Sequence, residues 1–309
     1  MEIEAKNLYK SYGNIQAVKD FSFKTESGKI YGIIGPNGAG KSTTIRMIMG
    51  ILKPDSGEIF FSNEKLNYET LNRIGYLPEE RGLYKKETCE DVLLYLAELK
   101  GKKKKEIYQK MINLLEKFNL ADYRKKKIEN LSKGMAQKLQ FISTVLHDPD
   151  YIFLDEPFSG LDPVSVEDLR SFLIELKNAG KVIMFSTHNM EQAERICDNL
   201  SLINHGVEVL GGTIEAIKSK FGKNSIIVSF EGDLPDLNQI AKNLIKYPKW
   251  VEIELLDKIT PQDCLNFLVK SSLKINKFEI VRPSLHSIFI KVVKEKYNEE
   301  VDYEDKNDI

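Results

Sequence analysis

The sequence predicts an α/β domain with a mainly parallel sheet, followed by a small α+β domain. Over residues 1–215, short apolar runs alternate with segments of helical spacing, as in sheets whose parallel strands are joined by helices. A glycine-rich segment separates one of these runs from a helix. Glycines within residues 211–222 mark a boundary, and residues 223–294 carry a second, smaller set of strands and helices. The length of 309 residues accommodates two domains.

The glycine-rich segment matches the pattern G-x-x-x-x-G-K-[ST]. Its members are Gly35, Pro36, Asn37, Gly38, Ala39, Gly40, Lys41, Ser42 and Thr43. The apolar run 29–34 precedes it, and a helical stretch from Thr43 to Met49 follows. In such a loop the backbone N–H groups surround phosphates, and the helix N-terminus favours an anion. A glycine-rich turn with a chance Lys-Ser pair is the alternative, which the strand–loop–helix context disfavours.

Individual residues of this segment have the chemistry of a triphosphate site. Gly38 and Gly40 permit backbone angles and a close approach that a Cβ would prevent. Lys41 can reach the β- and γ-phosphates, and the Ser42 hydroxyl can ligate Mg²⁺. The segment therefore predicts a P-loop NTPase fold that binds a nucleoside triphosphate.

The elements before and after this loop differ in kind. Residues 2–26 alternate loosely between apolar and polar, which predicts an antiparallel β-layer. Tyr12 lies in this layer, where it is either a base-stacking aromatic or a partly buried strand tyrosine. After the loop we expect strands at 58–61 and 73–78, and then a loop at 78–84. Three helices, the first two at 88–99 and 106–119 and the third beginning near Ser132, make residues 88–147 a helical insertion.

The β/α alternation returns at a buried strand, 151–154, that ends in Asp155 and Glu156. Further elements are a helix at 163–178, a strand at 181–185 ending near His188, a helix through 196 and a hairpin at 200–210. The carboxyl ends of parallel strands share one edge of a sheet, where ligands bind, and Gly35, Asp155 and His188 all fall at such ends. One acidic residue can hold Mg²⁺ and the other can accept a proton from an attacking water. A solvated acidic pair is the alternative, which the apolar strand disfavours.

Composition restricts the setting. Lys+Arg of 45 against Asp+Glu of 46 gives a net charge of -1, which argues against a nucleic-acid partner held by bulk charge. Cys89, Cys197 and Cys264 are too few and too widely spaced for a disulfide framework or a zinc cluster, so we expect a reducing, cytoplasmic setting. The N-terminal residues have no secretory h-region, and no apolar run approaches the ~20 residues that cross a bilayer.

These motifs, in this order, resemble the ATP-binding subunit of an ABC transporter over residues 1 to about 215. Walker A is 35–43, Walker B is 151–155 with Glu156 following, the signature is 131–135 and the D-loop is 159–162. The resemblance implies ATP and Mg²⁺ as cofactors. It implies that Lys41 and Ser42 contact phosphate and Mg²⁺, that Asp155 is a Mg²⁺ ligand and that Glu156 is the general base. His188 would contact the γ-phosphate, Tyr12 would stack on the adenine, and Asp162 would have a role in the nucleotide site. Ser132 and Gly134 would contact the ATP of a partner subunit.

Two positions depart from the family pattern. Glu79 stands where the family has its Q-loop glutamine, and a carboxylate there accepts from water or ligates Mg²⁺ but cannot donate as an amide can. The signature reads Leu-Ser-Lys-Gly-Met, so Lys133 adds a cation and Met135 removes an amide. The wording of residues 78–84, Pro-Glu-Glu-Arg-Gly-Leu-Tyr, resembles the sodium-extrusion branch of the family.

The resemblance also implies partners. One Walker A and one signature per chain imply a homodimer or heterodimer of ATP-binding subunits. Separate integral membrane permease subunits would hold the dimer at the inner face of the cell membrane and carry an exported or imported substrate. Two rivals are a soluble ABC-type ATPase not coupled to transport and an unrelated P-loop kinase or GTPase. The first would be expected to show a second cassette, long coiled coils or zinc cysteines, and the second leaves the signature without a purpose.

The C-terminal third is predicted as a small α+β accessory domain over residues 223–294. Strands are expected at 226–230, 251–255 and 277–281, and helices at 236–245, at 261–270 and after Pro283. The domain resembles the C-terminal extension of the same branch, with dimer stabilisation or partner contact as its expected role. Residues 295–309 are acidic and polar, which predicts a disordered tail.

Overall fold

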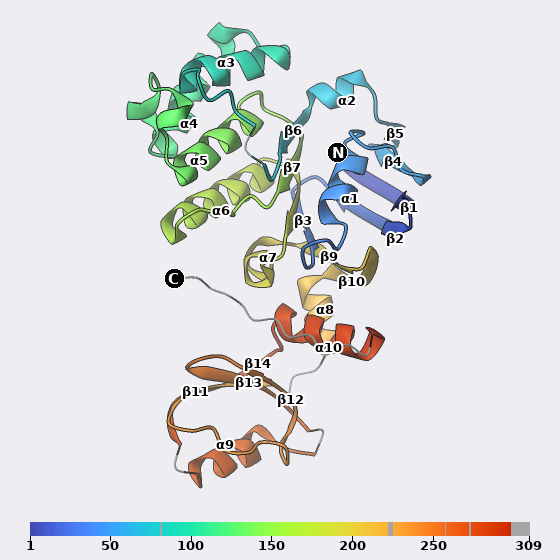
Figure 1. Cartoon of the computed structure of the whole chain (residues 1–309), viewed down its shortest axis with the longest axis vertical. Coiled ribbons are helices and arrows are strands. Elements are labelled where there is room, and N and C mark those ends of the chain that lie inside the picture. The colour runs from blue at the N-terminus through green and yellow to red at the C-terminus, as the bar shows by residue number, and fades with distance from the viewer. Residues whose placement is uncertain (81, 222–224, 257, 272, 298–309) are drawn as a thin grey trace. The chain divides into compact units, whose positions relative to one another are not determined.

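The computed structural model describes residues 1–80, 82–221, 225–256, 258–271 and 273–297. The chain divides into two compact units, Met1–Gly211 and Gly212–Ile309 (Figure 1). The boundary expected at residue 215 falls inside helix α8 (Ile214–Lys220), which belongs to the second unit. No helix among the described residues is both long enough and apolar enough to cross a membrane.

A mixed sheet forms the centre of the first unit. Within the described residues it has ten strands in the order β5-β4-β1-β2-β10-β9-β3-β8-β7-β6. Strands β1, β2, β4 and β5 pair antiparallel, whereas β9, β3, β8, β7 and β6 pair parallel. The strands are β1 (Glu2–Tyr12), β2 (Ile15–Glu26), β3 (Lys29–Ile34), β4 (Ser56–Phe61), β5 (Glu64–Lys65), β6 (Ile74–Leu77), β7 (Tyr151–Asp155), β8 (Val182–Thr187), β9 (Asn199–Asn204) and β10 (Val207–Thr213).

The parallel strands are apolar because both of their faces are covered. Every residue of β7 and β8 is buried, and so is all of β3 after its first residue. Neighbouring residues such as Ile152 and Phe153 point to opposite faces of the sheet, yet neither is exposed. Strands with this pattern need helices on both sides. The antiparallel layer and the parallel sheet predicted from the sequence are confirmed.

Seven α-helices of the first unit are described, and three of them form the predicted helical insertion. Helices α3, α4 and α5 pack against one another (Figure 1). The Thr88 hydroxyl accepts from Asp91 N and caps the start of α3. The helices are α1 (Lys41–Ile48), α2 (Tyr68–Asn72), α3 (Cys89–Leu99), α4 (Lys104–Lys117), α5 (Lys133–Val145), α6 (Pro163–Asn178) and α7 (Met190–Ile196).

The second unit has its own antiparallel sheet, in the order β12-β13-β11-β14. Its core includes Ile226, Val251 and Ile253 from the strands and Cys264 and Leu268 from helix α9. The elements are β11 (Ser225–Glu231), β12 (Ala241–Lys246), β13 (Trp250–Leu255), α9 (Pro261–Val269), β14 (Lys274–Val281) and α10 (Leu285–Tyr297).

Two predictions for the second unit need correction. The helix expected at 236–245 is wrong, because residues 241–246 form β12 and pair with β13. The apolar spacing of Leu237, Ile240 and Leu244 also suits a short helix, and strand pairing overrides this local pattern. Residues 295–297, expected in a disordered tail, belong to α10. The rest of that prediction lies outside the described residues.

Candidate nucleotide-binding site

The glycine-rich loop joins β3 to α1 at the carboxyl edge of the parallel sheet. Gly35 N donates to Thr187 O at 3.3 Å, which ties the loop to the end of the neighbouring strand β8. Gly40 has a φ of 104°, and a Cβ built on it would lie 2.2 Å from Ala17 O. Gly38 has a φ of 78°. Both positions therefore require glycine, for conformation at Gly38 and also for space at Gly40.

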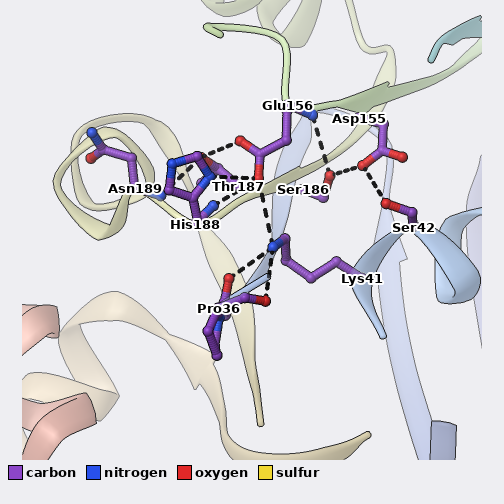
Figure 2. Close-up of polar contacts among 10 residues, drawn as sticks. Pro36, Lys41, Ser42, Asp155, Glu156, Ser186, Thr187, His188 and Asn189 are labelled. Carbon is purple, nitrogen blue, oxygen red and sulfur yellow. Dashed lines mark hydrogen bonds and ion pairs between the residues drawn. The ribbon is translucent and has the colours of Figure 1, made fainter. Parts of the chain in front are cut away.

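Lys41, the first residue of α1, turns its ammonium group back onto the loop. Its Nζ donates to Gly35 O at 2.8 Å and to Pro36 O at 3.1 Å, and lies 3.6 Å from Glu156 Oε1. The Lys41 side chain is only 6% exposed. Figure 2 shows this ammonium group between the loop carbonyls and Glu156. A buried cation thus lies where a phosphate group would enter the loop.

Asp155 ends β7 and faces the Ser42 hydroxyl (Figure 2). Ser42 Oγ donates to Asp155 Oδ1 at 3.1 Å, and the Ser186 hydroxyl donates to the same oxygen. Asp155 Oδ2 is buried without a hydrogen-bond partner, although buried carboxylate oxygens are normally satisfied. The Ser42 hydroxyl and the unpaired Asp155 oxygen are hard oxygen donors of the kind that Mg²⁺ prefers. Mg²⁺ usually binds through one or two carboxylates together with phosphates and water.

The residues present therefore fit a nucleotide-bound magnesium ion. Among the described residues no group of three or more His, Cys, Asp or Glu side chains could hold a metal by itself. A site made of Ser42 and Asp155 would consequently depend on phosphate oxygens for the remaining ligands.

Glu156 carries its carboxylate into a set of donors from the end of β8. Its Oε1 accepts from His188 N at 3.0 Å and lies 2.9 Å from His188 Nδ1. Its Oε2 accepts from the Thr187 hydroxyl at 3.2 Å. The Glu156 backbone has a φ of 49°, an uncommon conformation outside glycine that clusters at functional sites. The hydrogen bond with Glu156 raises the pKa of His188, against the opposing effect of partial burial.

A cavity of about 240 Å³ lies over the loop and is lined by six of the nine residues of the predicted phosphate-binding segment 35–43. Glu79 also lines it, so the residue at the Q-loop position faces the same space as Lys41 and Ser42. Its lining consists of Ala17, Asn37, Gly38, Gly40, Lys41, Ser42, Thr43, Glu79 and Glu156. A second, larger hollow of about 480 Å³ extends from Glu156 and His188 along the D-loop.

Four other predicted residues do not line this cavity. Ser132 uses its hydroxyl to cap α5 by accepting from Met135 N at 3.2 Å. Gly134 adjoins the D-loop, since a Cβ built on it would lie 3.7 Å from Gly160 O. Asp162 caps α6 by accepting from Val164 N and Ser165 N, and its pKa is lowered, chiefly by the Ser165 hydroxyl. Tyr12 is 50% exposed at the end of β1.

Ser186 and Thr187 are functional candidates to which sequence reasoning assigned no role. The Ser186 hydroxyl holds Asp155, the Thr187 hydroxyl holds Glu156, and Glu156 N donates to Ser186 O at 3.2 Å. Their position could have suggested a role, since both residues precede His188 at the end of a strand. Their partners Asp155 and Glu156 can be identified only when β7 and β8 are known to be neighbours in the sheet.

Family models match both parts of the chain. Residues 18–159 match the model described as ABC transporter. Residues 212–293 match the model of the C-terminal domain of ATP-binding proteins like DrrA1-3. Together with the relatives below, these matches place the chain in the family of ABC transporter ATP-binding proteins.

Relatives and solved structures agree with this assignment. The chain is 43% identical over 290 residues to the ABC transporter ATP-binding protein YhaQ of Bacillus subtilis (strain 168), covering 93% of this chain and 97% of the relative. It is 38% identical over 207 residues to the ABC transporter ATP-binding protein NatA of the same organism, covering 66% of this chain and 84% of NatA. A solved structure of an ATP binding subunit of an ABC transporter superposes with a TM-score of 0.67 at 34% identity, covering 72% of this chain and 94% of that one. The predicted P-loop fold is confirmed.

Proposed function

We propose that the chain binds MgATP, hydrolyses it to ADP and phosphate, and thereby powers transport through separate membrane permease subunits. One observation carries the proposal. The Glu156 carboxylate lies between the Lys41 ammonium group and His188, at the edge of the cavity over the phosphate loop. A proton acceptor, a phosphate-binding cation and a histidine thus meet at the place where a γ-phosphate would lie.

Each residue has a role suited to its position. Lys41 binds the β- and γ-phosphates and exchanges its loop carbonyls for phosphate oxygens when ATP enters. Ser42 and Asp155 hold Mg²⁺, with Glu79 as a further oxygen donor at the cavity wall. The ion, when bound, neutralises charge on the phosphate oxygens. Tyr12 stacks on the adenine at the open side of β1.

Glu156 acts as the general base. A water molecule attacks the γ-phosphorus, its proton passes to the Glu156 carboxylate, and the bond from that phosphorus to the β–γ bridging oxygen breaks. Thr187 and the His188 backbone hold the carboxylate in place through the hydrogen bonds described above. His188, whose pKa is raised, contacts the γ-phosphate from the other side.

A second ATP-binding subunit completes the site. Ser132 and Gly134 do not line the cavity that contains Lys41, so a γ-phosphate bound there meets these residues only when another subunit supplies them. A homodimer or a paired heterodimer satisfies this requirement, with Asp162 and the D-loop near the seam. The exposure of Ser132 and Lys133 and the partial exposure of Gly134 support this arrangement.

Permease subunits supply the path for the substrate and hold the dimer at the inner face of the membrane. The relatives' names support a transporter, and the wording of residues 78–84 together with the partial match to NatA supports the sodium-extrusion branch. Export of sodium ions, or of a small molecule or peptide, is the transport that we propose. The C-terminal unit would stabilise the dimer or contact a partner.

A reconstituted transport assay tests the proposal. The chain and a candidate permease are placed in vesicles loaded with radioactive sodium or a candidate cargo, and MgATP is added. Efflux that requires MgATP and is lost with Lys41→Ala is expected. MgATP hydrolysis by the chain that no permease stimulates would contradict the coupling, and absence of hydrolysis would contradict the enzyme assignment.

A further inference from the structure

We propose that Gln140 is a positioning residue for Glu79. Its side-chain amide holds the two peptide carbonyls on either side of Glu79, and so directs the Glu79 carboxylate into the cavity over the phosphate loop. The inference rests on the proposed function, because that cavity is where MgATP would bind.

The geometry of the amide carries the inference. Gln140 Nε2 donates to Pro78 O at 3.5 Å and to Glu80 O at 3.3 Å, and the residue is only 4% exposed. A glutamine amide has two N–H donors, and here one amide serves the carbonyls immediately before and after Glu79. The amide therefore bridges the three-residue segment that has Glu79 at its centre. Glu79 itself lines the cavity together with Lys41 and Ser42.

Helix α5, which carries Gln140, packs closely against β6. The contact of the Gln140 amide with the carbonyls of Pro78 and Glu80 is called the Gln140 clamp below. A Cβ built on Gly75 would lie 2.3 Å from Thr144 O, so α5 and β6 are in direct backbone contact. The Thr144 hydroxyl donates to Tyr76 O at 3.2 Å. Side chains one helical turn apart thus hold the chain at residue 76 and again at residues 78 and 80.

Gln137 offers a matched comparison on the same helix. It is 3% exposed, and its Nε2 donates to Pro157 O at 3.4 Å, away from the Glu79 segment. The substitutions Gln140→Met and Gln137→Met remove the same amide at the same depth of burial. Only the first releases the carbonyls that flank Glu79.

A double-mutant cycle on the full chain tests the inference. The kcat/KM for MgATP is measured for the wild type, Gln140→Met, Glu79→Ala and the double variant. Each single substitution is expected to lower kcat/KM about tenfold, a size typical of the loss of hydrogen bonds that position a group, and the double variant should equal Glu79→Ala. Gln137→Met combined with Glu79→Ala should be additive. A double variant lowered about a hundredfold, or single variants at the wild-type level, would overturn the inference.

A second readout needs no nucleotide. Amide hydrogen exchange of residues 76, 77, 79 and 80 in the nucleotide-free chain should be about tenfold faster in Gln140→Met and unchanged in Gln137→Met. Equal exchange in both variants would overturn the inference. If Gln140→Met does not fold, Gln140→Glu keeps the shape of the side chain and removes the donors. Amide exchange in this variant should also be faster than in the wild type at residues 76, 77, 79 and 80, and exchange at the wild-type rate would overturn the inference.

The two levels of proposal fail differently. Absence of MgATP hydrolysis by the wild type would remove the proposed function. A wild type that hydrolyses MgATP, with no coupling between residues 79 and 140, would remove only the positioning role of Gln140.

Discussion

Lys41 Nζ and Glu156 Oε1 lie 3.6 Å apart in a pair that is almost fully buried. The two residues come from the start of α1 and the end of β7, and strand β8 separates β7 from β3, the strand that leads to Lys41. A buried ion pair leaves an uncompensated charge when one partner is removed. The pair therefore joins the cation proposed to bind phosphate to the proposed base.

Glu156→Gln should separate ATP binding from hydrolysis. An amide preserves the size of the side chain but cannot accept a proton from water, so kcat should fall about a hundredfold or more. MgATP binding should persist, and size-exclusion chromatography with MgATP should show a trapped dimer. Turnover at the wild-type level would remove Glu156 as the general base. Lys41→Ala, which should fail to bind MgATP, is the control.

Glu79→Gln should leave ATP hydrolysis broadly intact. The amide oxygen can still accept a hydrogen bond from water or face Mg²⁺, so we expect kcat/KM within a factor of about three of the wild type. Steady-state hydrolysis over a range of free Mg²⁺ concentrations is the measurement. A collapse of activity at low Mg²⁺ would show instead that the carboxylate is a required ligand.

The His188–Glu156 contact should make stability depend on pH. The pKa of His188 is raised in the folded chain, mainly by its hydrogen bond with Glu156. A raised pKa stabilises the folded state below the unfolded value of about 6.5, and this contribution is lost as pH rises through the folded value. His188→Ala should therefore lower Tm more at pH 6 than at pH 9. An equal loss of Tm at both pH values would contradict the ion pair.

His147 should contribute to acid unfolding with the opposite sign. Burial is the main cause that lowers its pKa to about 4, and its Nε2 lies 3.1 Å from Ile74 O. The unfolded state binds the extra proton between pH 6.5 and 4, so stability falls as pH falls through that window, by at most about 3 kcal/mol. His147→Gln keeps a donor for Ile74 and should flatten this loss. Urea unfolding at several pH values measures it, and parallel curves for the two chains would exclude His147.

Local patterns were sufficient to predict much of the site. The loop from Gly35 to Thr43 was identified because a strand, a glycine-rich turn and a helix follow one another directly in the sequence. Asp155 and His188 follow apolar runs, which predicts that they lie at strand ends. Because ligands bind at the carboxyl ends of parallel strands, this position made both residues candidates for the site. The YhaQ and solved-structure matches agree with the fold predicted in this way.

Apolar patterns that are compatible with both a helix and a strand were not sufficient to predict the secondary structure. Residues 236–245 have apolar spacing compatible with a helix, and only pairing with β13 makes residues 241–246 a strand. The hydroxyls of Ser186 and Thr187 were unremarked for a similar reason. Their partners Asp155 and Glu156 are distant in the sequence and become neighbours only through the β7–β8 pairing.

The sequence alone thus determined the glycine-rich loop, the succession of strands and helices along the chain and the acidic residues at the strand ends. These features depend on residues that are close together along the chain. Tertiary structure decided which groups meet. The contact of Lys41 with Glu156, the unpaired oxygen of Asp155 and the clamp of Gln140 on the residues flanking Glu79 all depend on packing between distant segments. The order of the strands within the sheet and the packing of the helices set these contacts, and local periodicity predicts neither of them.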